Sequence, residues 1–592
     1  MVLPKKEGGT YLRKTKIICT LGPATDDYER LKALITNGMN VARLNFSHGT
    51  YEEHGRRIRM VREAARELDV EVGLMLDTKG PEIRTGPLKA GQVELRPGQR
   101  FVLTNRPVEG DENEVQISYH DLPSQVKPGD CILIADGVIQ LSVIEADDKD
   151  IVCQVVAGGV LGERKGINLP GVRTNLPFLS QKDVEDINFG IEQRVDFIAA
   201  SFVRTAQDVI DIRRILEEKS ANIDIIAKIE SQEGLDNLDD IIKVADGVMV
   251  ARGDLGVEIP TEEVPLVQKV IIEKCRAQGK PVIIATQMLE SMVNVPRPTR
   301  AEASDVANAI FEGADAIMLS AETAAGKYPV VAVETMARIA RRTEMALPYE
   351  NMLAARRFEG RRTVTDAISY ATCATATDLE ASAIVTATKS GHTARMVAKY
   401  RPRAPIIATT PSAEVVRKLT LVWGVYAILV PESRGTDEMI ETALDAAVGR
   451  HLISPGDLVV ITAGTPGLPG TTNLLRVQVV GKVLVKGTGI GARAITARAR
   501  IILDPSRPGS FAPGDIIVAR GTDRDYMPLV EKAGGIITEQ GGLTSHAAIV
   551  GINLDIPVIV GAPQATRLIQ DGEIITMDTA RGQIYRGQAH VR

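Results

Sequence analysis

The stretch NIDIIAKIESQEGLDNLDDIIKVADGVMVARGD, residues 222–254, contains two apolar runs separated by an amphipathic helical segment. A strand–helix–strand unit of this length produces two parallel neighbouring strands. Because residues i and i+2 of a strand share a face, Lys228 and Glu230 point the same way. Glu230 and Asp254 then emerge close together at one end of the sheet. A buried lysine beside two carboxylates suits a divalent cation with a phosphorylated ligand.

The same alternation of apolar run and helical segment continues on both sides of this stretch. About eight βα units in succession predict a closed (β/α)8 TIM barrel, with an open doubly wound sheet as the structural alternative. The expected strands are 16–20, 41–46, 72–76, 197–201, 225–229, 248–251, 282–285 and 316–319.

Polar side chains lie where these strands end. One such residue is usually a strand terminus or a helix cap, but here strand after strand ends in this way. Active sites of (β/α)8 barrels lie at the carboxyl ends of the strands, so we expect the active site there. The residues are Arg43, Asn45, Ser47, Asp77, Thr78, Ser201, Lys228, Glu230, Gly253, Asp254, Thr286, Gln287, Ser320 and Glu322.

Three other stretches depart from the barrel pattern. Short β-rich runs with Pro-Gly and Asp-Gly turns predict an inserted all-β module, and a second α/β pattern after the barrel predicts a small open sheet. A further α/β unit follows a glycine-containing join at 481–491. The expected domains are a barrel from 1–79 and 177–346, an inserted β-barrel domain at 80–176, an α/β open-sheet domain at 347–477 and a terminal α/β domain at 478–592.

Composition narrows the class of protein. The chain has 592 residues, 44% hydrophobic and 25% charged, with a net charge of −6. This charge gives no general attraction to nucleic acid or anionic lipid. We find no signal peptide and no apolar run near ~20 residues, and the five cysteines are scattered. We therefore expect a cytoplasmic protein with reduced cysteines that binds neither nucleic acid nor membrane.

Several long motifs, in one order, resemble pyruvate kinase over about residues 10–477. The resemblance implies transfer of a phosphoryl group from phosphoenolpyruvate to ADP and then protonation of the enolate to pyruvate, the final step of glycolysis. It also implies a β-domain lid, an effector and oligomerisation domain at 347–477, the cofactors Mg²⁺ (or Mn²⁺) and K⁺, and a homotetramer. The motifs are VARLNFSHG (41–49), LDTKGPEIRTG (76–86), KIES (228–231), ARGDLGVE (251–258), ATQMLESM (285–292) and LSAETAAGKYP (319–329).

The resemblance assigns roles to the strand-end residues. Lys228 matches the lysine that stabilises the transition state, and Glu230 and Asp254 match the Mg²⁺ ligands. Arg43 matches a substrate-binding arginine, which suits forked phosphate contacts. Gly253 and Asp254 match the turn whose N–H groups bind the substrate carboxylate. Thr286 matches the substrate-contacting threonine near the protonated carbon, with a relay through water, Ser320 and Glu322 as a hypothesis.

Two further sets of residues match the cation and nucleotide sites. Glu82 stands where K⁺-dependent members have glutamate, so we expect K⁺ dependence. The oxygen ligands for K⁺ would come from Asn45, Ser47, Asp77 and Thr78. The nucleotide contacts would come from Asn45, His48, Arg84 and Lys165, with helix capping or packing as the alternative for His48.

The TKSGHT stretch resembles the family's effector loop. Hydroxyls, a lysine and a helix N-terminus suit a phosphorylated metabolite, although an ordinary capped helix is the alternative. The glycine-rich segment 464–472 would close over the ligand. The predicted effector residues are Thr388, Lys389, Ser390, Gly391 and Thr393.

The terminal stretch GGLTSHAAIVGINLDIPVIVG, residues 541–561, resembles the swivelling phosphohistidine domain of phosphoenolpyruvate-utilising enzymes. His546 matches the phosphorylated histidine. The sequence departs from that family at Gly551–Asn553, where an arginine is usual, and no nucleotide-grasp domain completes the relay. A structural or regulatory appendage is therefore the alternative to a working phosphohistidine.

Two other function classes compete with the kinase reading. A Mg²⁺-dependent lyase or aldolase acting on pyruvate would use paired carboxylates, but needs neither the lid nor Lys228 in this place. A phosphocarrier or sensor based on His546 would have an inactive barrel, although every expected barrel residue is present.

Overall fold

The computed structural model describes residues 12–356, 363–433, 435–464, 472–481 and 483–587. These residues fall into two compact units. One comprises the chain up to Tyr349 together with Ala413–Ala427, and the other comprises most of the remainder. The first unit contains the barrel and the inserted β-module, and the second contains two α/β sheets.

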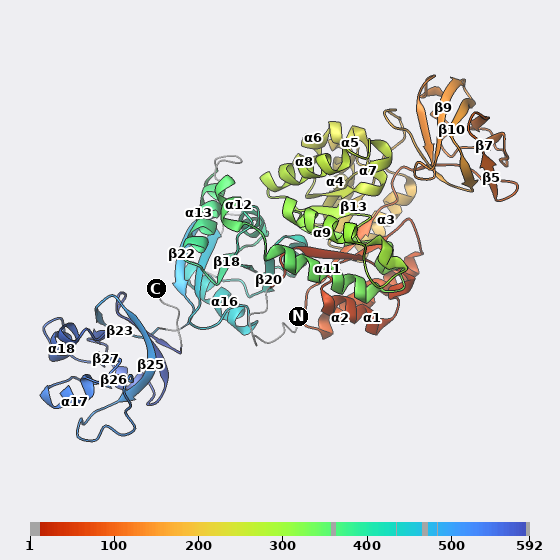
Figure 1. The fold of residues 1–592 in the computed structure, drawn as a ribbon. Coiled ribbons are helices and arrows are strands. Elements are labelled where there is room, and N and C mark those ends of the chain that lie inside the picture. Colours follow the sequence, from red (N-terminus) through yellow and green to blue (C-terminus); the bar gives the residue numbers. More distant parts are fainter. Residues whose placement is uncertain (1–11, 357–362, 434, 465–471, 482, 588–592) are drawn as a thin grey trace. The chain divides into compact units, whose positions relative to one another are not determined.

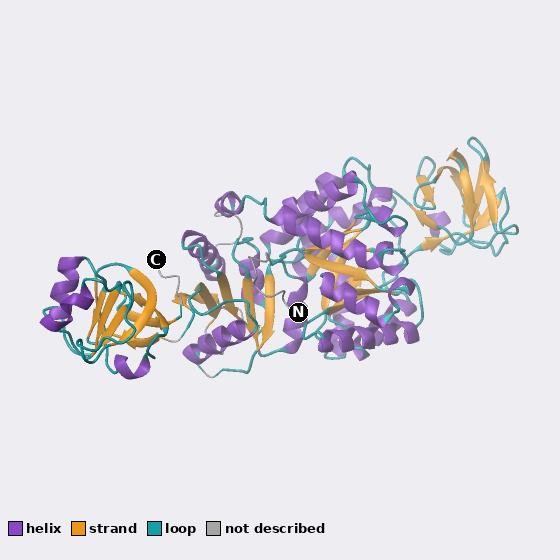
Figure 2. Cartoon of the chain, turned by 60° about the horizontal axis from the view of Figure 1, so that its bottom comes forward, coloured by secondary structure: helices purple, strands orange, loops and turns teal. Residues whose placement is uncertain are grey.

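Eight parallel strands form a closed barrel in the order β1-β17-β16-β15-β14-β13-β3-β2, which confirms the predicted TIM barrel and excludes an open sheet. Helices surround these strands (Figures 1 and 2). The strands are β1 (Lys16–Thr20), β2 (Val41–Asn45), β3 (Gly73–Asp77), β13 (Phe197–Ala200), β14 (Asp224–Ile229), β15 (Gly247–Ala251), β16 (Val282–Ala285) and β17 (Ala316–Leu319).

The barrel strands read as almost continuous apolar runs because both of their faces are buried. One face packs inside the barrel, where Met75, Phe197 and Met249 belong to one apolar cluster. The other face packs against the helices. These are α1 (Tyr28–Asn37), α2 (Tyr51–Glu67), α3 (Gln181–Glu192), α4 (Ala206–Glu218), α5 (Gln232–Asp236), α6 (Leu238–Val244), α7 (Arg252–Glu258), α8 (Val264–Ala277), α9 (Arg300–Glu312), α10 (Ala321–Ala324) and α11 (Pro329–Glu344).

The inserted module is a seven-stranded sheet in the order β4-β12-β8-β9-β10-β6-β7. An antiparallel bridge between Thr85 and Ile117 joins the chain after β4 to the chain after β7, so the sheet curls back on itself. This finding agrees with the predicted β-barrel lid. The strands are β4 (Ile83–Arg84), β6 (Arg100–Thr104), β7 (Glu114–Gln116), β8 (Cys131–Ile134), β9 (Ile139–Ala146), β10 (Asp150–Ala157) and β12 (Gly166–Asn168), and β5 (Gln92–Leu95) pairs with β11 (Gly159–Gly162).

The α/β sheet that follows the barrel has the order β20-β19-β18-β21-β22. Its strands are β18 (Ala383–Ala387), β19 (Ile406–Thr410), β20 (Val425–Leu429), β21 (Leu458–Gly464) and β22 (Thr472–Val479). Its helices include α13 (Val364–Asp378), α14 (His392–Ala398) and α16 (Thr436–Gly449), whereas α15 (Ala413–Lys418), between β19 and β20 in the chain, belongs to the barrel unit.

The terminal α/β sheet has eight strands in the order β23-β30-β29-β25-β26-β27-β28-β24. These strands are β23 (Val483–Lys486), β24 (Thr488–Ile490), β25 (Ala494–Ile501), β26 (Ile516–Ala519), β27 (Gly535–Thr538), β28 (Val558–Val560), β29 (Ile574–Asp578) and β30 (Gln583–Arg586). Its helices are α17 (Met527–Val530), α18 (His546–Leu554) and α19 (Ala565–Leu568).

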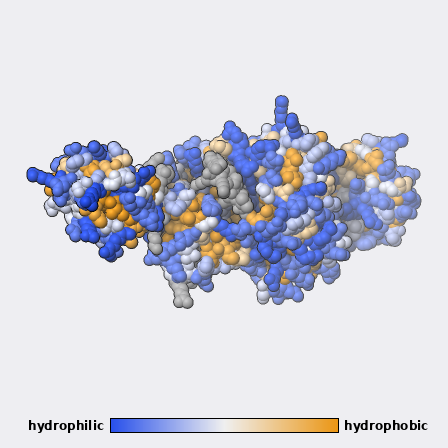
Figure 3. All heavy atoms as spheres, turned by 90° about the horizontal axis from the view of Figure 1, so that it is seen from below, coloured by the Kyte–Doolittle hydropathy of each residue, from blue (hydrophilic) through white to orange (hydrophobic). Residues whose placement is uncertain are grey.

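No described helix combines the length and the apolar composition that crossing a membrane requires. The face drawn in Figure 3 is largely hydrophilic, with scattered hydrophobic residues. The five cysteines are all free, and four of them are buried.

Candidate active site

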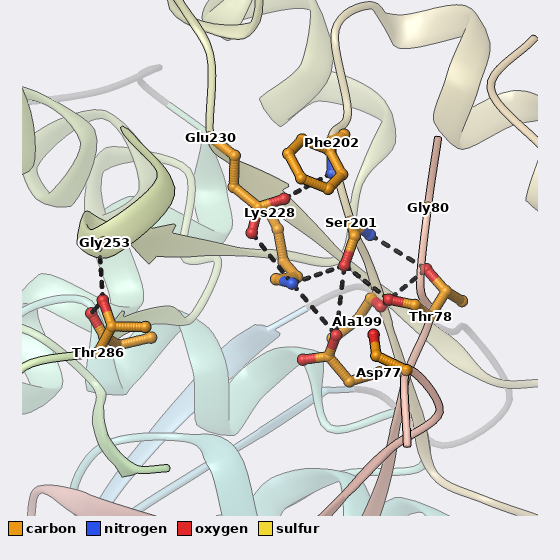
Figure 4. A network of polar contacts seen from close by, with 12 residues as sticks. Asp77, Thr78, Gly80, Ala199, Ser201, Phe202, Lys228, Glu230, Gly253 and Thr286 are labelled. Atoms are coloured by element: carbon orange, nitrogen blue, oxygen red, sulfur yellow. Dashed lines mark hydrogen bonds and ion pairs between the residues drawn. The ribbon is translucent and has the colours of Figure 1, made fainter. Parts of the chain in front are cut away.

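Lys228 lies at the centre of a polar network at the carboxyl ends of the barrel strands (Figure 4). Its Nζ donates to Ser201 Oγ at 2.6 Å and to Asp77 Oδ1 at 3.1 Å, and it lies 3.0 Å from Glu230 Oε1. Burial alone would lower the pKa of Lys228, but the carboxylates of Asp77 and Glu230 raise it above its ordinary value. The structure therefore holds a charged ammonium group in a buried position.

Asp77 joins the two cations of the site. Its Oδ2 accepts from Arg43 Nε at 2.6 Å, while its Oδ1 accepts from Lys228. Arg43 Nη1 also donates to Thr20 Oγ1 at 2.9 Å. Burial by itself would raise the pKa of Asp77, but the positive charges of Arg43 and Lys228 hold it below its ordinary value. Asp77 is thus ionised and fixes both cations.

Glu230 and Asp254 supply two further carboxyl groups at neighbouring strand ends. Glu230 is 1% exposed, and its Oε2 accepts from the Phe202 N–H at 2.6 Å. Burial, together with the neighbouring Asp254 carboxyl group and against the opposing charge of Lys228, raises the pKa of Glu230 to about 7. Burial also raises the pKa of Asp254. Two desolvated carboxyl groups side by side are costly unless a proton or a cation compensates them, so this pair fits a hard divalent ion.

The described residues contain no group of three or more His, Cys, Asp and Glu side chains that would enclose a metal by themselves. The two carboxylates therefore leave most of the coordination sphere to other oxygen ligands. Mg²⁺ is commonly bound in this way, through one or two carboxylates plus substrate phosphates and water.

Ser201 and Phe202 are central to the network, although the sequence indicated Ser201 only as a strand-end residue without a role and did not single out Phe202. Ser201 Oγ donates to the Thr78 carbonyl at 2.7 Å and accepts from Lys228. Phe202 has φ +56°, and this turn directs its N–H to Glu230. Their position at the end of the fourth barrel strand was the one signal available, because their contacts depend on the turn that follows.

Thr286 and Gln287 both have positive φ, at +66° and +54°. This conformation is strained for a β-branched residue and is typical of functional sites. Thr286 Oγ1 accepts from the Gly253 N–H at 2.8 Å and donates to the Ala285 carbonyl at 2.6 Å. Gly253 and Asp254 were expected in a turn, but they lie in the first turn of α7. The Gly253 N–H is thus already used by Thr286.

The predicted relay from Thr286 is only partly assembled. Glu322 is 3% exposed, and its carboxylate accepts from the N–H groups of Leu289, at 3.1 Å, and Ser320, at 2.7 Å. Burial raises the pKa of Glu322. These contacts are with the backbone, so they hold the loops in place rather than linking the side chains of Ser320 and Thr286.

The predicted K⁺ ligands lie at the ends of two adjacent strands. Asn45 and Asp77 are directly paired across β2 and β3, and Thr78 follows immediately. Asn45 Oδ1 accepts from the Ser47 N–H at 3.2 Å. Together these residues offer amide, hydroxyl, carbonyl and carboxylate oxygens, and the whole set carries one negative charge. Such a donor set fits a hard monovalent cation.

The predicted nucleotide residues come from the loop after β2 and from the base of the lid. Arg84 pairs with Gly166 across β4 and β12, which brings it next to Lys165. Arg84 Nη2 forms an ion pair with Glu82 Oε2 at 2.6 Å, and Lys165 is exposed. The His48 side chain is exposed, and the N-cap of α2 is Thr50.

A cavity of about 180 Å³ opens between the base of the lid and the ends of β13, β14 and β15. Its lining includes the acidic residues Glu82, Asp136, Asp254 and Glu258, together with Arg204. Asn168 Nδ2 donates to Glu258 Oε1 at 3.1 Å, which connects the lid to α7. The cavity thus lies beside one of the paired carboxylates and under the lid.

The predicted effector residues follow β18 and lead into α14. Thr388 Oγ1 accepts from the Gly391 N–H at 3.0 Å, and Lys389 Nζ lies 2.5 Å from Glu432 Oε1. Ser390 is exposed, whereas Thr393 is buried and contacts Thr472 Oγ1 at 2.9 Å. Most of the predicted closing segment, residues 465–471, lies outside the described residues.

His546 is the first residue of α18, and Ser545 is its N-cap. Its Nδ1 lies 3.1 Å from Thr522 Oγ1. Ser545 Oγ and Thr538 Oγ1 are buried and have no hydrogen-bond partner within the described part of the chain. Two hydroxyl groups without a partner near a helix N-terminus are donors of the kind that suit an anion such as phosphate.

Three family models match the chain. "Pyruvate kinase, barrel domain" matches residues 12–333, "Pyruvate kinase, alpha/beta domain" residues 366–478, and "PEP-utilising enzyme, mobile domain" residues 511–582. The pyruvate kinases of Bacillus licheniformis and Geobacillus stearothermophilus are each 54% identical over 98% of this chain and 100% of their own length. A crystal structure of a pyruvate kinase from Cryptosporidium parvum matches with a TM-score of 0.76 and 42% identity, covering 79% of this chain and 96% of that one.

Proposed function

The chain belongs to the pyruvate kinase family and transfers a phosphoryl group from phosphoenolpyruvate to ADP, giving pyruvate and ATP, and we propose that Lys228 is the residue at the centre of this reaction. The observation that carries the proposal is the position of the Lys228 ammonium, which is held between Asp77, Ser201 and Glu230 at the mouth of the barrel. A fixed and desolvated positive charge at this point opposes the negative charge that develops on the transferred phosphoryl oxygens.

Arg43 and Arg84 complete the positive charge around the phosphoryl group. Arg43 is already oriented by Asp77, so its remaining N–H groups can bind a phosphate without reorganisation. Arg84 lies at the base of the lid, paired with Glu82. Closure of the lid over ADP would bring Arg84 and Lys165 to the nucleotide phosphates, together with Asn45 and His48.

Glu230 and Asp254 are the proposed ligands of Mg²⁺ or Mn²⁺, which supplies Lewis-acid charge to the phosphoryl oxygens when bound. The charged residues Arg43, Asp77, Lys228, Glu230 and Asp254 sum to one negative charge when all are ionised. The site therefore needs a divalent cation before it attracts an anionic substrate.

Thr286 is the proposed contact for the enolate, near the carbon that is protonated. Its strained backbone keeps the hydroxyl group on the Gly253 N–H, at the start of α7. Gly253 and Asp254 bind the substrate carboxylate in this proposal, which requires Thr286 Oγ1 to release the Gly253 N–H as substrate enters.

We also propose that the enzyme depends on K⁺, and the loop after β2 and the end of β3 support this proposal. Asn45, Ser47, Asp77 and Thr78 provide oxygen ligands, and Glu82 adds no fixed cation that would replace K⁺. The test is the initial rate of pyruvate release from phosphoenolpyruvate with ADP and Mg²⁺, with and without K⁺ in Na⁺-free buffer. Equal rates at saturating substrate would refute the K⁺ assignment, and no pyruvate under any condition would refute the catalytic one.

The loop 388–393 is the proposed site of a phosphorylated allosteric effector. The exposed ion pair between Lys389 and Glu432 is the feature that supports it, because an incoming phosphate can replace the Glu432 carboxylate on the lysine. Residues 347–477 form the effector and oligomerisation domain in this proposal, with boundaries to the neighbouring domains at 79/80, 176/177, 346/347 and 477/478.

The terminal domain is proposed as a structural or regulatory appendage, with a working phosphohistidine at His546 as the second candidate. The hydroxyl groups of Ser545 and Thr538 favour the second candidate, because both are buried without a hydrogen-bond partner in the described residues and could donate to a phosphate. Incubation with labelled phosphoenolpyruvate separates the two. Label that is retained by the wild type and absent from His546→Ala supports phosphohistidine, and no label on either protein supports the appendage.

Homotetramer assembly and a cytoplasmic location are carried over from the family. The exposed side chains of Leu266 and Val270, one turn apart on α8, provide an apolar surface that subunit contact would cover. Light scattering of the purified protein decides the oligomeric state.

A further inference from the structure

The loop of residues 45–49 carries three of the proposed cation and nucleotide residues, yet its own hydrogen bonds are long. The His48 N–H donates to the Asn45 carbonyl at 3.3 Å, and the Ser47 N–H donates to Asn45 Oδ1 at 3.2 Å. The Phe46 N–H donates to the Asp77 carbonyl at 3.0 Å, so the start of the loop is tied to β3, while the amides of Ser47 and His48 make the two longer bonds. What lies behind the loop therefore contributes to its shape.

His54 of α2 lies directly behind this loop and is 2% exposed. Its Nε2 is 2.9 Å from the His48 carbonyl oxygen. Because a carbonyl oxygen only accepts, Nε2 must carry the proton and donate. The Nδ1 atom is buried and has no partner within the described ranges of the chain, so this contact is the one polar role that the imidazole has there.

The same imidazole also holds the loop by ring stacking. Phe46, between the proposed ligands Asn45 and Ser47, stacks on His54 with ring centroids 4.2 Å apart and an interplanar angle of 14°. Phe189 packs against the ring of Phe46 at 5.8 Å and against that of Tyr51 at 4.8 Å. One side chain therefore fixes both an aromatic ring and a carbonyl group of the loop.

The start of α2 is built so that His54 reaches back to the loop. Thr50 and Glu53 form a capping box, and the His54 N–H donates to the Thr50 carbonyl at 3.0 Å. Gly49 has φ +81°, and a side chain at that position would come within 3.3 Å of His54 Nε2 and 3.0 Å of Glu53 Oε2. The glycine thus allows the loop to turn tightly over the imidazole.

We propose that His54 is a positioning residue for the reaction: it orients Asn45, Ser47 and His48 for K⁺ and nucleotide by holding the loop from behind. His54 itself touches neither substrate nor cation. This inference rests on the proposed K⁺ site, and it adds a residue outside that site that determines how well the site binds.

The test is a K⁺ titration of the initial rate at saturating phosphoenolpyruvate, ADP and Mg²⁺. His54→Phe keeps a stacking ring and removes the donor, so it should raise the half-activating K⁺ concentration about 3- to 10-fold, the effect of one lost hydrogen bond. The kcat at saturating K⁺ should change much less. His54→Gln keeps an N–H donor near the same place and should restore much of the K⁺ affinity.

Tyr51→Phe is the matched control. It removes the hydrogen bond from Tyr51 to Asp186 Oδ1 in the same aromatic cluster but leaves the loop contact intact. The K⁺ response of this variant should equal that of the wild type. A folded His54→Phe enzyme with an unchanged half-activating K⁺ concentration would overturn the inference. A lower kcat without a change in K⁺ affinity would overturn it too.

Hydrogen exchange distinguishes a failure of the proposed K⁺ site from a failure of the proposed role of His54. The Ser47 and His48 amides should exchange faster in His54→Phe than in the wild type. In Tyr51→Phe they should exchange at the wild-type rate. If wild-type activity proves independent of K⁺, the K⁺ assignment fails while the exchange rates still decide whether His54 holds the loop. Unchanged exchange in His54→Phe would overturn the inference in that case.

Discussion

At the scale of single residues, two buried lysines of the barrel show how surroundings set their charge. Lys228 has carboxylates around it, and they raise its pKa. Lys16, at the start of β1, donates to a carbonyl group and lies over an aromatic ring, and the carboxylates of Glu344 and Asp315 act on it too weakly to offset its burial. Its Nζ donates to the Val425 carbonyl at 2.6 Å and lies 4.9 Å from the centre of the Tyr426 ring. Burial, with a smaller contribution from Arg13, lowers the pKa of Lys16 to about 7.

The low pKa of Lys16 predicts that its cost to stability depends on pH. Between pH 7 and its ordinary pKa of about 10.5, the unfolded chain binds the proton and the folded chain does not. Stability therefore rises with pH in this window, and the cost of Lys16 is greatest at pH 7 and below.

Replacing Lys16 by methionine should remove this pH dependence. Relative to the wild type, Lys16→Met should gain unfolding free energy at pH 7 and lose that advantage as the pH rises toward 10. The full change across the window is of order 3–5 kcal/mol. Urea midpoints of both proteins between pH 7 and 9.5 measure it. A difference between the two proteins that stays constant with pH would contradict the low pKa.

The sequence predicted individual strand-end residues better than their contacts. Lys228 and Glu230 were expected to share a face, and they do lie 3.0 Å apart. The double contact of Asp77 with Arg43 and Lys228 was not predicted, because it joins three strands whose register a single sequence does not reveal. The hydrogen bond from Phe202 to Glu230 was also missed, since it depends on a positive φ that no glycine or asparagine signals.

At the scale of elements, the strands were predicted to within about a residue because both of their faces are buried. The joins between elements were less predictable. Gly80 links β3 to the lid with φ +72°, and its N–H donates to Asp183 Oδ1 at 3.1 Å. A side chain at Gly80 would come within 2.9 Å of Ser201 Cβ, and Ser201 in turn holds Lys228. This join therefore connects the lid to the polar network around Lys228.

Gly80→Ala should for this reason reduce both stability and turnover. The positive φ costs about 1 kcal/mol for alanine, and the contact with Ser201 adds to it. Gly91 is a matched control, because it has the same φ of +72° and open space around its Cβ position. Gly91→Ala should show the backbone cost alone, with kcat near that of the wild type. Equal kcat values for the two variants would contradict a role for the Gly80–Ser201 contact.

At the scale of the whole molecule, the chain between β19 and β20 belongs with the barrel. Ala413–Ala427 clusters with the barrel unit, and Leu421 is part of the inner apolar cluster of the barrel. Arg417 Nε donates to the buried Asp196 at 2.8 Å. Local patterns do not predict such packing between residues more than two hundred positions apart. This segment is therefore part of the barrel unit, although in the chain it lies between two strands of the α/β sheet that follows the barrel.

The proposed effector site predicts a loss of regulation without a loss of catalysis. Lys389→Ala removes the exposed cation from the loop after β18 while leaving every proposed catalytic residue in place. Activity without effector should match the wild type, and activation by sugar monophosphates, sugar bisphosphates or AMP should be lost. Rate against phosphoenolpyruvate concentration, with and without each compound, measures this. A wild-type enzyme that responds to none of them would refute the regulation itself.

The most direct test of the central claim is the turnover of Lys228→Met with phosphoenolpyruvate, ADP, Mg²⁺ and K⁺. Its charge acts chiefly in the transition state, so the variant should bind phosphoenolpyruvate, seen by calorimetry, while kcat falls by about 10²–10³-fold or more. Removing the Lys228 ammonium group leaves the buried carboxylates of Asp77 and Glu230 without its compensating positive charge. A thermal melt must therefore first show that the variant is folded. A folded Lys228→Met enzyme that releases pyruvate at a rate near that of the wild type would contradict the account.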